Sequence, residues 1–292
     1  MKKHLALISL LIILSIFLLS GCSSNKEEKI VFADKQFEKM LQEELDKKEI
    51  YKSDLSEISG IMIAADRVLG LSGGGHKDKS VILFGFEEFE YEKVRYKEFG
   101  TIKTLEDLKN FPKLTSIRIY LQPNIDFNTI PNKGNITNLG LSQNKISNLE
   151  FLEGFDKLLY LSISSNKIVD LKGIENVPKL KRLNLNSNDI ESIPQLASFK
   201  DLENLDLTYN SVDDVSPLKD LSKLNYLSLY GNGISDITPL ANIKSLKQLF
   251  LNNNRITDIS ALKDFASFED LNISGNPIKN YEVIKHIENA VK

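Results

Sequence analysis

The stretch LKRLNLNSNDIESI, residues 180–193, decides the fold, because its order of residues recurs along the chain. Leucines stand at 180, 183 and 185, followed by Asn188 and Ile190. This spacing is neither the alternation of a half-exposed strand nor the 3.6-residue period of an amphipathic helix. The stretch is therefore tested first as one unit of an internal repeat.

A step of 22 residues from Asn188 reaches another asparagine in both directions, at positions 144, 166, 210, 232, 254 and 276. Aliphatic residues, with one phenylalanine, keep the same offsets ahead of most of these asparagines, and isoleucine or valine follows two positions later. The register runs through seven consecutive units without an insertion. Gln122 and Gly100 continue the step with other residue types, so the repeat weakens there.

Each unit is expected to form one coil of a solenoid, in which the L-x-L segment is a short strand. Strands of successive coils then stack in parallel about 4.8 Å apart. The leucines point inward, because a single coil cannot bury its apolar face alone. The asparagine amide has both a donor and an acceptor, so a stacked row of asparagines is expected to satisfy backbone groups inside the coils.

The second half of each unit reads ISDITPLANIKS at 234–245 and ITDISALKDFAS at 256–267. It is typical of a turn followed by one helical turn, which tolerates Pro217 and Pro239. Repeats of this length with a D-I-x-x-L tail resemble the internalin type of bacterial leucine-rich repeat. The resemblance covers residues 100–278 and implies an α/β solenoid: a leucine-rich-repeat horseshoe with a parallel concave sheet.

Both ends of such a sheet need covering, and the sequence predicts a helical cap at each. ADKQFEKMLQEELDKK, with Asp34 as N-cap, opens the N-terminal cap region, 34–99, and resembles the helical cap of internalin-type domains. Its apolar face is Phe37, Met40, Leu41 and Leu45. Ile58, Ile61, Ile63 and Asp66 then copy the strand half of a repeat. The C-terminal cap, 279–292, is expected to be a helix from Asn280 that covers the last coil with Tyr281, Ile284, Ile287 and Val291 on one face. His286 on this helix is interpreted as a solvated or packing residue.

An insertion occupies residues 70–99, including SGGGHKDK and an aromatic–glutamate alternation that favours a projecting strand pair. The three glycines predict a loop, but GGGH lacks the spacing of a phosphate-binding loop. Two interpretations stay open: a contact element, or a decoration that helps to close the N-terminal edge.

The first residues predict export. Lys2 and Lys3 precede an apolar run of 15 residues, Leu5 to Leu19, which is shorter than the roughly 20 residues of a membrane span. LSGC, ending at Cys22, resembles the lipobox of bacterial lipoproteins. The resemblance implies a signal peptide at 1–21, a diacylglycerol on Cys22, a polar tether over 22–33 and a place on the outer leaflet of the bacterial cytoplasmic membrane. The alternative is an ordinary buried or free cysteine.

Composition argues against several classes of function. The formal net charge is −3 and no basic cluster is present, which argues against nucleic acid. Three histidines and one cysteine offer no zinc cluster, and no G-x-S-x-G motif occurs. The sequence therefore predicts no enzyme activity, no metal and no cofactor.

The concave face is the candidate binding surface, because its outward side chains can vary without disturbing the core. Most are small and polar. The candidate partner-binding residues are aromatic residues and an arginine, the types that dominate interface hot spots: Tyr160, Arg182, Tyr209, Tyr226, Tyr230 and Phe250. The alternative is that these rings stack on one another for stability.

Two classes of function stay open for the anchored chain. The first is recognition of a protein or peptide through the concave face, as the internalin resemblance implies. The second is an envelope scaffold or a glycan-binding lipoprotein. The mixed Tyr, Arg and Asn surface favours a protein partner.

Overall fold

The computed structural model describes residues 27–73, 82–83, 89–91, 94–96 and 100–292, with side chains for 27–73 and 100–292. The predicted signal peptide, Cys22 and most of the glycine-rich loop lie outside the described residues. Among the described residues, none of the helices has both the length and the apolar character needed to span a bilayer.

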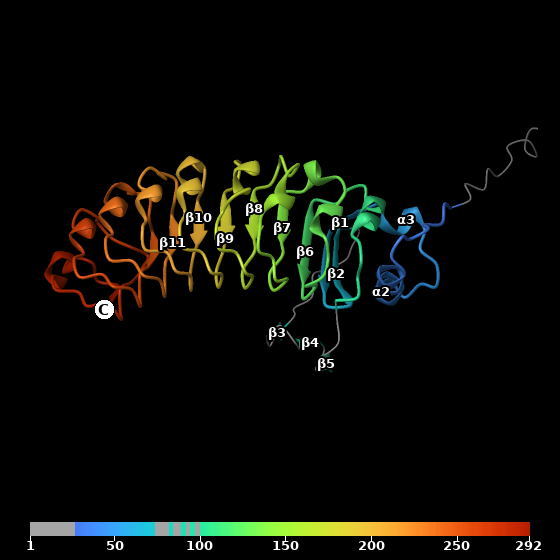
Figure 1. Cartoon of the computed structure of the whole chain (residues 1–292), viewed down its shortest axis with the longest axis horizontal. Coiled ribbons are helices and arrows are strands. Elements are labelled where there is room, and N and C mark those ends of the chain that lie inside the picture. Colours follow the sequence, from blue (N-terminus) through green and yellow to red (C-terminus); the bar gives the residue numbers. More distant parts are fainter. Residues whose placement is uncertain (1–26, 74–81, 84–88, 92–93, 97–99) are drawn as a thin grey trace, which may run out of the picture.

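The chain forms an elongated solenoid whose coils stack side by side (Figure 1). Eleven strands make one sheet in the order β14-β13-β12-β11-β10-β9-β8-β7-β6-β1-β2. Neighbouring repeat strands pair in parallel with partners 22 residues apart, such as Leu183 with Leu205. The repeat strands are β6 (Ser116–Tyr120), β7 (Asn138–Gly140), β8 (Tyr160–Ser162), β9 (Arg182–Asn184), β10 (Asn204–Asp206), β11 (Tyr226–Ser228), β12 (Gln248–Phe250) and β13 (Asp270–Asn272). The predicted leucine-rich-repeat solenoid with a parallel sheet is confirmed.

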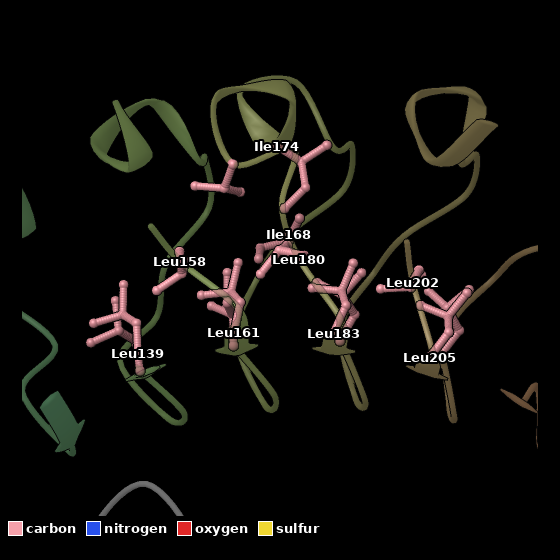
Figure 2. Packing of buried hydrophobic residues seen from close by; sticks show 14 of the residues in the cluster. Leu139, Leu158, Leu161, Ile168, Ile174, Leu180, Leu183, Leu202 and Leu205 are labelled. Atoms are coloured by element: carbon pink, nitrogen blue, oxygen red, sulfur yellow. The ribbon is translucent and has the colours of Figure 1, made fainter. Parts of the chain in front are cut away.

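The core lies between the sheet and a row of short 3₁₀ turns. Figure 2 shows Leu139, Leu161, Leu183 and Leu205 pointing from their strands toward these turns, each over the same place in its coil. Pro217 and Pro239 lie in the first turn of their helices, where the missing N–H costs no bond. The turns are η1 (Glu106–Asn110), η2 (Phe127–Thr129), η3 (Lys133–Asn135), η4 (Glu150–Leu152), η5 (Ile174–Asn176), η6 (Pro194–Ser198), η7 (Ser216–Leu218), η8 (Thr238–Asn242), η9 (Ser260–Leu262) and η10 (Tyr281–Ile284).

The asparagine row runs along the inside of the coils as predicted. Asn188 Nδ2 donates to the carbonyl oxygens of Ile163 and Leu185, at 3.0 and 2.9 Å. Its Oδ1 accepts the N–H of Ile168, in the preceding coil, at 3.1 Å. The same bonds recur from Asn166 to Asn276. One side chain therefore satisfies backbone groups of two coils.

The asparagine row ends at Gln122 and Gly100, where the repeat weakens and other residue types take the asparagine position. Gln122 is buried and donates to the carbonyl oxygen of Ala65, while its Oε1 has no hydrogen-bond partner among the described residues. Gly100, which has no side chain, is held by Asp66, whose Oδ1 accepts the N–H groups of Gly100 and Thr101 at 3.0 Å each. Asp66 thus ties together the two ends of the inserted segment.

The N-terminal end begins with helix α2 (Lys35–Leu45), at the place predicted, and a short helix α3 (Lys52–Leu55). The Asp34 side chain caps α2 by accepting from the N–H groups of Gln36 and Phe37. Phe37, Met40 and Leu41 are buried. The predicted polar tether over 22–33 extends too far, because Ile30 and Phe32 are buried in the core. The folded part of the chain therefore begins before residue 33.

Two buried carboxylates join this end to the first coil. Asp107 is fully buried, and its oxygens accept the N–H groups of Ala33 and Asp34, at 2.9 and 2.7 Å. Asp34 in turn accepts the N–H of Lys103 at 2.6 Å. Backbone donors therefore stabilise both acids, and the two side chains clamp the start of the chain onto the repeats.

Strand β1 (Ile58–Ala64) continues the sheet in parallel with β6, as the sequence predicts. Strand β2 (Arg67–Gly73) then pairs with β1 in the antiparallel sense and ends the sheet. The insertion forms a separate antiparallel sheet of β3 (Ile82–Leu83), β4 (Phe89–Tyr91) and β5 (Val94–Tyr96). The predicted strand pair is thus part of three strands.

The predicted C-terminal helix is wrong. The 3₁₀ turn η10 ends at Ile284, and β14 (Ala290–Val291) pairs in parallel with β13. Ile284 and Ile287 are buried, but Val291 of the predicted apolar face is 50% exposed. Ile284 and Ile287 lie 22 residues after Leu262 and Phe265 and take the same inward places, so the segment is one more, shortened coil. His286 Nε2 lies 2.8 Å from the carbonyl oxygen of Phe265.

Candidate binding surface

The strand face is defined as the outward residues of β6 to β13. The pairing register brings outward residues 22 positions apart to lie side by side, so Tyr160 neighbours Arg182 and Asn204 neighbours Tyr226. The residue between the outward pair on each strand, such as Leu183, is buried. Sequence register alone therefore sets which side chains meet on this face.

Tyr160 and Arg182 form the first pair. The Arg182 Cζ lies 4.9 Å from the centre of the Tyr160 ring, and Arg182 Nη1 donates a hydrogen bond to the Tyr160 hydroxyl. Tyr160 is 40% exposed. A guanidinium stacked on an aromatic ring gains a cation–π interaction and loses rotamer freedom. Arg182 is thus an exposed cation held in one orientation.

A cavity of about 380 Å³ opens on the strand face beside this pair. Tyr160 and Arg182 line one side and Tyr226 the other, with polar side chains between them. The lining residues are Tyr160, Leu161, Ser162, Arg182, Leu183, Asn184, Asn204, Asp206 and Tyr226. Two of these residues, Leu161 and Leu183, are buried leucines of the strands, and the other seven carry polar groups that can orient a ligand.

Tyr226 and Phe250 form the second pair, on β11 and β12. Their ring centroids are 5.7 Å apart at an angle of 48°. Partial burial raises the pKa of the Tyr226 phenol, and the carboxylate of Asp206 raises it further. A tyrosine phenol is protonated at neutral pH even at its ordinary pKa of about 10, so the Tyr226 hydroxyl can donate a hydrogen bond. Phe250 packs against Tyr226 but does not itself line the cavity.

Tyr209 and Tyr230 form a third pair, away from the lining of this cavity. Their centroids are 4.6 Å apart, and the Tyr209 hydroxyl donates to that of Tyr230 at 2.5 Å. This bond raises the pKa of the Tyr209 phenol. Tyr209 has a φ of 51°, in the left-handed region, and a side chain at Gly231 would meet its ring at 2.8 Å. Gly231 therefore leaves the space that Tyr209 occupies.

The six residues predicted as one surface thus form three pairs. Four of them, Tyr160, Arg182, Tyr226 and Phe250, lie at or against the cavity. Tyr209 and Tyr230 lie at the turn that follows the strands. The polar lining residues Asn184, Asn204 and Asp206 were not among the predicted site residues. The pairing register was the signal for them, because it sets Asn204 between Arg182 and Tyr226 and Asp206 beside Asn184.

A smaller cavity of about 200 Å³ lies at the irregular coil after Gln122, between Pro123 and Phe151. Sequence analysis gave no signal for it. Within the described ranges, no group of three or more His, Cys, Asp or Glu side chains is arranged to hold a metal ion.

Comparison with known proteins agrees with this architecture. The family described as Leucine Rich repeats (2 copies) matches residues 178–220, 202–242, 222–264 and 244–286. A comparison with curated protein sequences gives no match.

Three solved structures share the fold. Internalin C2 of Listeria monocytogenes is 23% identical, with a TM-score of 0.55, over 89% of this chain and 92% of the other. The internalin InlF of the same species is 23% identical, with a TM-score of 0.52, over 89% and 95%. A leucine-rich-repeat protein of Leptospira interrogans is 24% identical, with a TM-score of 0.54, over 65% of this chain and 51% of the other. The chain carries leucine-rich repeats and has an internalin-like fold; at these identities the likeness shows the fold alone.

Proposed function

We propose that this chain is a lipid-anchored, extracytoplasmic recognition protein that binds a protein or peptide through the concave, outward side of its sheet. The observation that carries the proposal is the open cavity flanked by Tyr160, Arg182 and Tyr226. Tyrosine and arginine are among the residue types most enriched at the hot spots of protein interfaces. In this proposal the chain binds its partner and performs no catalysis.

Two features favour a protein partner. The aromatic residues at the cavity are separated by amides, a carboxylate and a guanidinium, which match the mixed polar and apolar groups of a polypeptide. The strands beneath them are fixed by pairing on both sides, so the surface is preorganised and binding costs little ordering.

The proposal is tested by photo-crosslinking on intact cells, followed by mass spectrometry of captured proteins. The wild-type chain is expected to capture a partner that the triple variant Tyr226→Ala, Tyr230→Ala, Phe250→Ala does not. Val169→Ala is the matched control, because Val169 is an exposed apolar side chain outside the strands. Equal capture by the triple variant and the control would overturn the proposal.

The anchor is proposed from the sequence, because Cys22 closes the apolar run and is the only cysteine in the chain. Two acyl chains hold a protein stably to a bilayer, whereas one does so marginally. Metabolic labelling with a palmitate analogue is expected to mark the wild type and Ser23→Ala but not Cys22→Ala. An unlabelled wild type, or label that survives Cys22→Ala, contradicts the anchor.

A further inference from the structure

We propose, resting on the proposed function, that the partner places one carboxylate in the cavity against the guanidinium of Arg182, next to an apolar group that contacts Tyr226 and Phe250. The carboxylate belongs to an acidic side chain or to a chain terminus. These two sources share one chemistry, and the experiment below separates them.

The first argument is the unmatched charge of Arg182. Several lysines beside the strands are paired with acids 22 residues away, as Lys181 is with Glu203 at 3.1 Å and Lys247 with Glu269 at 3.2 Å. In the side chains that the structure describes, Arg182 makes no such ion pair, and its polar partner is the Tyr160 hydroxyl. The cavity therefore presents a cation that forms no ion pair with a described carboxylate, although Asp206 lines the same cavity.

The second argument is geometry. A guanidinium has about five N–H donors, and the bond to Tyr160 uses one of them. The contact with the Tyr160 ring and this hydrogen bond hold the guanidinium beside the cavity, with its other donors left for a ligand. A planar fork held in this way binds a carboxylate with two parallel hydrogen bonds, which a flexible ammonium does not do.

The third argument limits the partner to one carboxylate. Asp206 lines the cavity on the neighbouring strand, and its Oδ1 accepts the N–H of Thr208 at 2.9 Å. Its negative charge disfavours a second acid placed beside it. Tyr226 lines the cavity and packs against Phe250 of the next strand, so two rings lie at this side. The fitting segment therefore carries one acid, followed by neutral or basic residues and an aliphatic or aromatic side chain.

The test pans a library of random heptapeptides, displayed on phage, against the full-length chain. Binders are expected to be enriched in one Asp or Glu beside an apolar residue. The best sequence is then synthesised with blocked ends and titrated by calorimetry. Replacing its acid by the corresponding amide, or Arg182 by Gln, is expected to weaken binding about tenfold to a hundredfold.

A double-mutant cycle makes the contact specific. The amide peptide is expected to lose nothing further on Arg182→Gln, because the two changes remove the same interaction. Arg255→Gln is the control, since Arg255 does not line the cavity, and it is expected to leave the affinity unchanged. Arg182→Lys keeps the charge without the fork and is expected to lie between wild type and Arg182→Gln. Thermal unfolding checks that each variant is folded.

A second peptide, with a free C-terminus in place of the acidic side chain, separates the two sources of the carboxylate. If it binds more tightly than the blocked peptide, the site recognises a chain terminus. If it binds more weakly, the site recognises an acidic side chain. Binders that need Tyr226 and Phe250 but not Arg182 would overturn this inference and leave the proposed function standing. A library without any binder sensitive to the strand face would overturn both.

Discussion

Asn188 and Arg182 belong to one coil but face opposite environments. The inner position repeats one residue type from coil to coil, and each asparagine makes the same bonds to two coils. The strand face uses the same 22-residue register but varies its residues, with Tyr160, Arg182, Asn204 and Tyr226 on neighbouring strands. The inner row therefore stabilises the solenoid, while the strand face is free to specify a partner.

The largest expected effect follows from breaking the inner row. Asn188→Leu leaves the N–H of Ile168 without a partner. It also removes one of the two asparagine donors to each of the carbonyl oxygens of Ile163 and Leu185. At about 1–3 kcal/mol for the unsatisfied N–H and about 1 kcal/mol for each of the two lost hydrogen bonds, we expect a loss of about 3–5 kcal/mol in the free energy of unfolding. Urea denaturation measures it. Asn204→Leu, the same change on the strand face, is expected to cost less than about 0.5 kcal/mol; equal costs would contradict the comparison.

The N-terminal clamp should come next. Asp107→Ala leaves the N–H groups of Ala33 and Asp34 unpaired in the interior, which should lower the free energy of unfolding by about 2–4 kcal/mol. Asp107→Asn keeps one acceptor oxygen and is expected to lose less. Asp220→Ala, at an exposed ion pair, serves as control. If Asp107→Ala and Asp220→Ala had the same denaturation midpoint, the hydrogen bonds of Asp107 would not stabilise the fold.

The C-terminal coil contains both a buried and an exposed aliphatic residue, which can be compared by mutation. Ile284 is fully buried and Val291 is half exposed. Ile284→Ala should therefore cost about 2–3 kcal/mol, whereas Val291→Ala should cost less than about 0.5 kcal/mol, measured by urea denaturation. Similar losses at both positions would favour the cap helix expected from the sequence, in which the two share one face.

The smallest effect is expected at Tyr209. Asparagine tolerates the left-handed backbone better than tyrosine does, so Tyr209→Asn relieves strain while it removes the contact with Tyr230. The two changes oppose each other, and we expect the unfolding temperature to move by no more than about 2 °C in a thermal scan. Gly231→Ala, which intrudes on the ring, is expected to destabilise more. A larger fall in the unfolding temperature of Tyr209→Asn would show that the Tyr209–Tyr230 pair contributes substantially to the stability of the solenoid.

Much of the fold could be predicted because the same residue pattern recurs in consecutive 22-residue units. The register, the parallel strands, the asparagine row and the helix after Asp34 all follow from local patterns. The C-terminal segment failed because Tyr281, Ile284, Ile287 and Val291 also fit a helical spacing. Ile284 and Ile287 lie 22 residues after Leu262 and Phe265, and all four are buried. The 22-residue repeat, and not the helical spacing, therefore describes this segment.

The site was predicted in part. Register alone brings Tyr160 to Arg182 and Tyr226 to the strand that carries Phe250. The cavity, and the separation of Tyr209 and Tyr230 from it, depend on ring orientations and on a positive φ, which side-chain packing sets. The role of Asp66 depends on where the inserted segment returns, which no periodic pattern records.

The most direct test of the account is the unfolding temperature of the triple variant Tyr226→Ala, Tyr230→Ala, Phe250→Ala, measured on the same preparation that is used for partner capture. The account predicts a midpoint within about 6 °C of wild type, because these rings are only partly buried, together with loss of capture. A much larger fall with capture intact would mean that the rings hold the sheet together and that binding lies elsewhere.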